Sequence, residues 1–258
     1  MSNDALYLYG IVKNEYDIDW APQGIDGNPV FTLTEGSLSA VVHEFGEKPD
    51  LPTDVVKVKE QIIAHNEVLS EAIGSFGGVV PLKFGTVIVG KNGKSASYNL
   101  KEWLKEGKER LEKTWELVKG KKEYGIRIYY QKKQLVSELE ETGELSAIKR
   151  SIGEKSAGVA YLLEGKLKSE TAELLRAKVH QFKSAFYERL KGVTDNLVVN
   201  KSKLAINGEG DLLLNVSVLV RENEITFIKE SLEKYADDGF SYHLVGPFAP
   251  YSFVENIN

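Results

Sequence analysis

The chain has 258 residues, 42% hydrophobic and 28% charged, with 33 basic and 38 acidic side chains and a formal net charge of −5. This length predicts two domains with a substantial core, and the acidic balance argues against a large nucleic-acid footprint. Without cysteine, the sequence excludes disulfides and thiolate metal sites. Neither a secretory signal nor the roughly 20 apolar residues of a membrane helix can be found. We therefore expect a soluble, cytoplasmic protein with no membrane partner.

The first half of the sequence predicts the order strand, strand, strand, helix, strand, helix. Residues 5–12 form an apolar strand. Two further apolar segments, joined by Gly36 and Ser37, predict a hairpin. A helix follows, with Thr53 or Asp54 as its N-cap. The apolar positions of this helix recur at helical spacing: Val55, Val58, Ile62, Leu69 and Ile73.

The next segment predicts a strand region over 79–89, with Pro81 at an edge or a bulge. A second helix is expected from about 98 to 118, because its apolar residues fall on one face. The polar run at 119–123 is the best linker, which predicts domains over 1–120 and 121–258. The apolar face comprises Leu100, Trp103, Leu104, Leu111, Trp115 and Val118.

The second half predicts the order strand, helix, strand, strand, helix, strand. The first strand covers 124–130, short helical pieces fill 131–158, and a long helix runs from about 169 to 191. This order is the ferredoxin-like βαββαβ pattern. We predict an α+β protein of two domains, each a mainly antiparallel sheet with helices, the first a modified ferredoxin-like arrangement. The long helix has the stripe Leu174, Leu175, Val179, Phe182, Phe186 and Leu190.

The segment FGTVIVGKNG, residues 84–93, matches most of a phosphate-binding loop. Gly85 and Gly90 have the right spacing and Lys91 follows, but Asn92 stands where the magnesium-binding hydroxyl belongs. The interior of the loop is β-branched and favours extended backbone. We therefore predict a strand followed by a turn, and no nucleotide binding.

The sequence shows no local catalytic or metal-binding pattern. The four histidines, His43, His65, His180 and His243, are too far apart to form a local metal clip. We read them as ordinary surface or hydrogen-bonded residues and expect no enzyme activity, no metal and no cofactor. Two alternatives stay open. One is an RRM-like RNA-binding protein, since LYLYGI resembles a base-stacking strand; the other is a small-molecule enzyme on a ferredoxin-like scaffold.

Three segments together resemble the gas vesicle accessory proteins GvpL and GvpF. They are the opening strand LYLYGIV, the run VVPLKFGTVIVG, and the terminal GPFAPYSFV. Their order and spacing extend over nearly the whole chain, and the opening strand is closer to the GvpL branch. Phe248 replaces the tryptophan of many members and Ala249 replaces a proline, and both changes keep the apolar character.

This resemblance implies assembly rather than catalysis. It implies a gas vesicle associated factor that contacts the hydrophobic shell protein and other gas vesicle accessory proteins, with no nucleic acid as partner. The signature residues are then candidates for partner binding. The terminal aromatics either fold back onto the core or leave at least one ring exposed for the shell protein. These candidates are Lys83, Phe84, Phe248, Tyr251 and Phe253.

Overall fold

The computed structural model describes residues 4–13, 20–45, 54–141, 143–201, 210–234 and 239–254. They form two compact units. Unit 1 comprises the described residues within 1–124, 219–222 and 246–258, and unit 2 those within 125–218 and 223–245. The sequence-based division placed the end of the chain in the second domain, whereas here it packs within unit 1. We therefore propose two domains whose first member includes the end of the chain.

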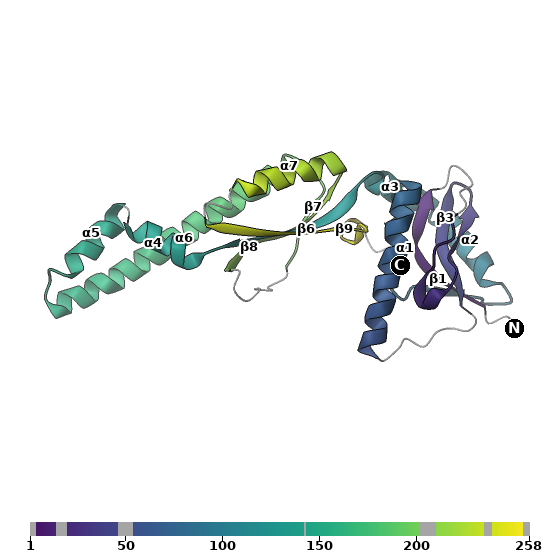
Figure 1. Cartoon of the computed structure of the whole chain (residues 1–258), viewed down its shortest axis with the longest axis horizontal. Coiled ribbons are helices and arrows are strands. Elements are labelled where there is room, and N and C mark those ends of the chain that lie inside the picture. Colours follow the sequence, from purple (N-terminus) through teal and green to yellow (C-terminus); the bar gives the residue numbers. More distant parts are fainter. Residues whose placement is uncertain are drawn as a thin grey trace. The chain divides into compact units, whose positions relative to one another are not determined.

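Unit 1 is built on an antiparallel sheet with β1 (Ala5–Lys13) in its middle. The strands follow the order β2-β3-β1-β4, and β5 also pairs with β1 (Figure 1). β1 is buried along almost its whole length, which suits its apolar and aromatic sequence. The other strands are β2 (Phe31–Glu35), β3 (Leu38–Phe45), β4 (Val80–Pro81) and β5 (Val87–Val89).

The hairpin predicted at Gly36 and Ser37 is present. β2 and β3 pair from Phe31↔Val42 to Glu35↔Leu38, which leaves a two-residue loop. Gly36 has φ +62°, the positive value that a type II′ turn requires at its first central position.

The segment predicted as a strand over 79–89 is instead two short strands along the same edge of β1. Pro81 of β4 lies opposite Gly10, and Val89 of β5 lies opposite Ala5. A Cβ on Gly10 would lie only 2.7 Å from Val79 Cγ2, so this residue permits the close approach of β4. The predicted turn follows β5: Lys91 bridges Lys94, and Asn92 and Gly93 have φ +57° and +75°. Both positive angles fit a type I′ turn.

Three helices complete unit 1, α1 (Val55–Phe76), α2 (Ala96–Glu106) and α3 (Lys108–Val118). The single helix predicted over 98–118 is therefore broken at Gly107, where ψ is 0°. α1 begins at its predicted cap, because the Asp54 side chain accepts a hydrogen bond from Val56 N. Its predicted apolar stripe is only partly buried: the fully buried residues of α1 start at His65, and Val55 is 66% exposed.

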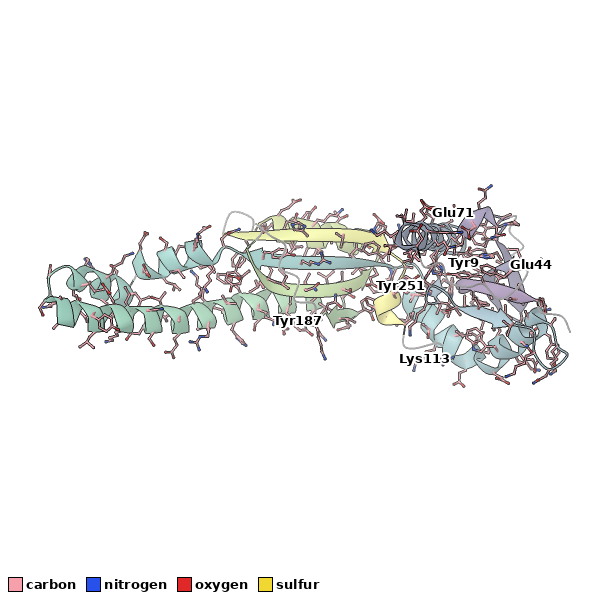
Figure 2. All side chains as sticks on the ribbon, turned by 90° about the horizontal axis from the view of Figure 1, so that it is seen from below. Tyr9, Glu44, Glu71, Lys113, Tyr187 and Tyr251 are labelled. Atoms are coloured by element: carbon pink, nitrogen blue, oxygen red, sulfur yellow. The ribbon has the colours of Figure 1, made fainter. Side chains whose placement is uncertain are left out.

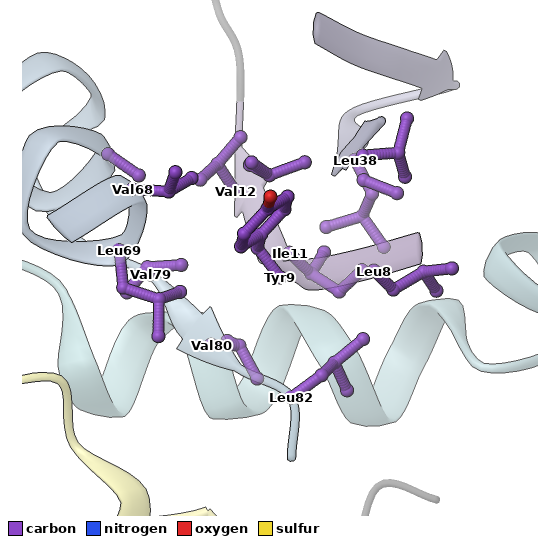
Figure 3. Close-up of a cluster of buried hydrophobic side chains, with 14 of the residues drawn as sticks. Leu8, Tyr9, Ile11, Val12, Leu38, Val68, Leu69, Val79, Val80 and Leu82 are labelled. Atoms are coloured by element: carbon purple, nitrogen blue, oxygen red, sulfur yellow. The ribbon is translucent and has the colours of Figure 1, made fainter. Parts of the chain in front are cut away.

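The core of unit 1 lies around β1 (Figure 3). Tyr9 lies in this cluster with apolar side chains from β1, β3, α1 and the segment around β4. The apolar residues labelled with it in the close-up are Leu8, Ile11, Val12, Leu38, Val68, Leu69, Val79, Val80 and Leu82.

Unit 2 contains a second antiparallel sheet, in the order β7-β8-β6-β9, and the long helix α6. The strand order, together with the sequence of elements, is consistent with a ferredoxin-like arrangement. The strands are β6 (Lys122–Tyr130), β7 (Leu197–Val199), β8 (Asp211–Val220) and β9 (Phe240–Phe248). The helices are α4 (Lys132–Glu141), α5 (Gly143–Ile152), α6 (Ala157–Lys191) and α7 (Glu222–Glu233).

Helix α6 is longer than predicted, and its predicted apolar stripe is only partly buried. It begins at Ala157 rather than near 169 and has 35 residues. Leu175, Phe186 and Leu190 are buried as expected, but Leu174 is 46% exposed. Phe182 is half-buried and meets Phe240 edge to face, with ring centroids 4.6 Å apart.

Two proline positions near the end of the chain differ in their effect. β9 continues through Pro247, after a cis Gly246–Pro247 peptide bond, and ends at Phe248. Pro250 then precedes a single 3₁₀ turn, η3 (Tyr251–Phe253). Only Pro250 therefore lies beyond the strand.

Candidate functional site

The candidate site is a buried network of tyrosine and histidine side chains in unit 1. Tyr7 Oη lies 2.8 Å from His65 Nδ1, and the Gly85 N–H donates to the same hydroxyl at 3.0 Å. His65 Nε2 lies 2.9 Å from Tyr251 Oη. These contacts join β1, α1, the turn before β5, and the 3₁₀ turn η3 near the end of the chain.

One tautomer of His65 satisfies the donors and acceptors of this network. In it, Tyr7 accepts from the Gly85 N–H and its own O–H donates to His65 Nδ1. His65 Nε2 then carries the hydrogen and donates to Tyr251 Oη. In this tautomer all four groups are satisfied, as buried polar groups require.

A second Tyr–His pair repeats the contact at Nδ1, but His43 Nε2 is buried without a hydrogen-bond partner among the described residues. Tyr9 Oη lies 2.7 Å from His43 Nδ1, and the Ile25 N–H donates to Tyr9 Oη at 2.9 Å. The Tyr7 ring stacks on the His43 ring, with centroids 5.1 Å apart and an interplanar angle of 3°. Tyr7 and His43 are register partners on β1 and β3, which explains why their rings meet.

Burial holds all of these groups in their neutral forms. Loss of solvation lowers the pKa of His43 and of His65 to about 4. The same burial raises the pKa of Tyr9 to about 12 and raises the pKa of Tyr7 and Tyr251 still further. At pH 7 a phenol that stays protonated is a weak nucleophile and an imidazole with a pKa of about 4 is a weak base, so these pairs suit a hydrogen-bonded structural network.

The segment after β9 is held by a second polar contact. The buried carboxylate of Glu123 accepts from Ser252 N at 2.9 Å and from Ser252 Oγ at 2.6 Å. Tyr251 and Phe253 pack against the core of unit 1. Two charge-assisted hydrogen bonds and two apolar rings thus attach this segment to the unit.

All three segments that resemble the gas vesicle proteins contribute to this network. The opening strand supplies Tyr7 and Tyr9, whose sequence LYLY places them two residues apart on one face. The middle segment supplies the Gly85 N–H and the Phe84 ring, which meets His65 edge to face with centroids 5.9 Å apart. The final segment supplies Tyr251 (Figure 2).

The predicted site residues differ in their exposure. Phe84, Tyr251 and Phe253 are half-buried and pack against the core. Lys83 is exposed, and Phe248 is 48% exposed. The structure therefore brings Phe84 and Tyr251 together around His65, and leaves Lys83 and Phe248 facing solvent.

Sequence reasoning did not identify Tyr7, Tyr9, His43, His65 and Glu123 as one cluster. The prediction for the histidines is an ordinary surface or hydrogen-bonded role; His43 and His65 are buried and hydrogen-bonded, to partners that lie 34 to 186 residues away along the chain. The available signal was the pair of phenols on one face of an otherwise apolar strand. A buried phenol needs a hydrogen-bond partner, and strand position alone does not name that partner.

Two further kinds of site, a metal cluster and a membrane-spanning helix, are absent from the residues that the structure describes. Within them, no group of three or more His, Cys, Asp or Glu side chains is placed to hold a metal ion. The helices that the structure describes include none with the length and apolar character needed to span a bilayer.

Comparison with known proteins gives consistent results. The family model "Gas vesicle synthesis protein GvpL/GvpF" matches residues 5–255. Gas vesicle protein F of Haloferax mediterranei is 27% identical over 98% of this chain and 94% of its own length. Gas vesicle protein L1 of Halobacterium salinarum is 23% identical over 97% of this chain and 90% of its own length.

Solved structures show the same fold. The crystal structure of GvpF from Anabaena aligns with a TM-score of 0.72 at 19% identity, over 98% of each chain. GvpF from Microcystis aeruginosa aligns with a TM-score of 0.66 at 19% identity, over 97% of this chain and 99% of the other. Since the family model extends over nearly all of the sequence, including the three segments that meet at the Tyr–His network, the chain belongs to the GvpL/GvpF family of gas vesicle synthesis proteins.

Proposed function

We propose that this protein is a non-enzymatic assembly factor that binds the hydrophobic gas vesicle shell protein and other gas vesicle accessory proteins. The observation that carries the proposal is the family match over residues 5–255. The neutral Tyr–His network supports it, because the family segments build a rigid core there and not a reactive site. The protein would act in the cytoplasm, where shell subunits must be kept from aggregating before they assemble.

The proposed contact residues are the candidate residues whose side chains are exposed to solvent. Phe248 presents a half-exposed ring at the end of β9, and Lys83 is exposed in the turn between β4 and β5. An exposed aromatic ring is a common anchor in protein interfaces. Phe84, Tyr251 and Phe253 would act indirectly, by holding the backbone on which Lys83 and Phe248 are presented.

The RNA-binding alternative loses its main support. It required exposed rings on the opening strand, but Tyr7 is 3% exposed and Tyr9 is fully buried. Buried rings cannot stack on bases.

A capture experiment with purified shell protein tests the proposal. The tagged chain is incubated with shell protein, and bound shell protein is quantified against a tag-only control. We expect capture by the wild type and at least about a fivefold loss for Phe248→Ala, since a hot-spot ring contributes about 1–2 kcal/mol or more. Lys83→Glu should also weaken capture.

Matched variants separate the contact from general effects. Phe227→Ala removes a ring that is 54% exposed on α7, and Lys113→Glu reverses an exposed charge on α3. Both should capture shell protein as the wild type does. Equal capture by Phe248→Ala and Phe227→Ala would reject the proposed contact residues, and absence of capture by folded wild-type protein would reject shell binding itself.

A further inference from the structure

Unit 2 contains a groove whose lining includes none of the residues of the Tyr–His network. It has a volume of about 700 Å³ and lies between α4 and α6, two helices that run alongside each other in Figures 1 and 2. The α6 wall extends from Glu164 to Lys183. At 1.5 Å per residue, this wall is roughly 28 Å long. The groove is therefore elongated, with α4 residues 132, 136 and 140 on the other side.

The floor of the groove is apolar and contains one unpartnered hydroxyl. Leu167, Leu175 and Val179 line it from α6 and Val136 lines it from α4. Thr171 also lines it, is 6% exposed, and has an Oγ1 without a hydrogen-bond partner among the described residues. A buried hydroxyl without a partner is costly, and an occupant with a polar group would satisfy it.

The rim of the groove carries an excess of positive charge. Lys132, Lys168, Arg176 and Lys183 are exposed there, against the two carboxylates Glu140 and Glu164. Lys149 of α5 already neutralises Glu140 at 2.9 Å. Among the residues that the structure describes, none of the four rim cations forms an ion pair, whereas neighbouring Lys166 and Lys178 pair with Glu170 and Glu138.

We propose that this groove binds an amphipathic helix of a partner protein, one whose apolar stripe is bordered by aspartate or glutamate. The apolar floor would receive the stripe, and the rim cations would pair with the acidic residues at its sides. This surface belongs to unit 2, whereas Lys83 and Phe248 belong to unit 1. The inference therefore goes beyond shell binding and does not depend on it.

The shape of the groove favours a helix over a small ligand. Its α6 residues recur every three or four positions: Glu164, Leu167, Lys168, Thr171, Ala172, Leu175, Arg176, Val179, His180 and Lys183. Such a face packs along a second helix by interdigitation of side-chain ridges. A compact ligand would contact only part of this length.

A designed probe tests the proposal directly. An 18-residue helical peptide carries leucines at i, i+3, i+4 and i+7 with flanking glutamates, and a second peptide replaces every glutamate by lysine. Fluorescence anisotropy with the full chain at low salt should show micromolar binding of the acidic peptide. The basic peptide should bind at least about tenfold more weakly, and added salt should weaken the acidic complex.

Two variants locate the binding. The double variant Lys168→Glu with Arg176→Glu should weaken the binding of the acidic peptide at least about tenfold, because two attractive charges become repulsive. The control, Lys166→Glu with Lys191→Glu, makes the same change in net charge on α6 at residues that do not line the groove, and should stay within about twofold of the wild type. Ala172→Trp, which fills the groove, should abolish binding while circular dichroism confirms that the variant is folded.

Several outcomes would overturn the inference. Equal binding of the acidic and basic peptides would show that the rim charges do not select the occupant. Equal effects of the two double variants would show that the peptide binds outside this groove. Tighter binding of dodecanoate than of the acidic peptide would make the occupant a small amphiphile. A wild-type dimer that Ala172→Trp converts to monomer, measured by analytical ultracentrifugation, would make the occupant a second copy of the chain.

Discussion

The central strand of unit 1 and the long helix of unit 2 differ in how much of their length is buried. In unit 1, eight of the nine residues of β1 are buried, and its two phenols are tied to histidines from β3 and α1. In unit 2, α6 has 35 residues but buries only Thr171, Leu175, Phe186 and Leu190. The comparison indicates that β1 mainly stabilises the core of unit 1, whereas α6 mainly contributes exposed side chains to the surface of unit 2. The three tryptophans, Trp20, Trp103 and Trp115, all lie in unit 1, so tryptophan fluorescence follows the unfolding of that unit.

Among sequence changes at neutral pH, removal of residues 250–258 should produce the largest effect, and it should fall on unit 1. The deletion removes the Tyr251 and Phe253 rings from the core and both hydrogen bonds to Glu123. We expect a loss of about 5 kcal/mol in the free energy of unfolding, from partial burial of two rings and loss of two charge-assisted bonds. Denaturant titration followed by tryptophan fluorescence measures it. An unchanged fluorescence midpoint would show that the segment is not structural.

Phe186→Ala should destabilise unit 2 and leave unit 1 intact. Phe186 is 3% exposed and packs against Phe240, so its truncation should cost about 3–4 kcal/mol. Phe182→Ala is the internal comparison: because Phe182 is only half-buried, it should cost roughly half as much. Hydrogen–deuterium exchange of α6 peptides reports the loss. Equal costs at the two positions would contradict the observed packing of α6.

Acid should weaken unit 1 through its buried histidines. His43 and His65 have a folded pKa of about 4 against 6.5 for the unperturbed side chain. Below pH 6.5 the unfolded chain binds protons that the folded unit does not, so stability is full above pH 6.5 and falls as the pH drops toward 4. Each histidine should contribute a loss of up to about 3 kcal/mol over that interval.

Replacement of one histidine tests this pH dependence. His65→Gln should remove about half of the slope of unfolding free energy against pH between 6.5 and 4, as followed by tryptophan fluorescence. A slope identical to that of the wild type would mean that His65 is not held neutral by burial.

Tyr251→Phe should have a moderate effect confined to one hydrogen bond. The change keeps the ring but leaves His65 Nε2 without the hydroxyl that lies 2.9 Å away. An unpaired buried donor costs about 1–2 kcal/mol. Tyr161→Phe, at a position 76% exposed on α6, is the matched control and should be neutral. Thermal unfolding of both variants measures the two effects on stability. An unchanged Tm for Tyr251→Phe would argue against the network.

The smallest effect on stability is expected from changes at the N-termini of α1 and α6. The Asp54 side chain accepts a hydrogen bond from Val56 N at the start of α1, whereas Ser156 makes no side-chain cap bond at the start of α6. Asp54→Ala should therefore cost about 1 kcal/mol and Ser156→Ala about zero. Denaturant unfolding of the two variants provides the measurement. A larger cost at Ser156 would show that α6 is capped in solution.

Much of the local structure could be predicted because it depends on neighbouring residues. Gly36 specifies the hairpin turn and Asn92-Gly93 the following one, since both need positive φ. Asp54 marks the start of α1 through a bond two residues along the chain. Fold class, helix and strand order, and family membership also follow from patterns that are written in sequence order.

Only the tertiary structure decided which faces are buried and which residues meet. The apolar stripe of α1 is exposed at Val55 and buried from His65 onward. Leu174 and Leu175 are adjacent in the sequence, yet only Leu175 is buried. Tyr7, His65 and Tyr251 form one network across 58 and 186 residues of separation. The sequence pattern predicts that one face of a helix or strand is apolar, and a buried phenol is expected to need a hydrogen-bond partner. Which residue becomes that partner depends on the folding of the chain, because only folding brings distant segments within hydrogen-bond distance.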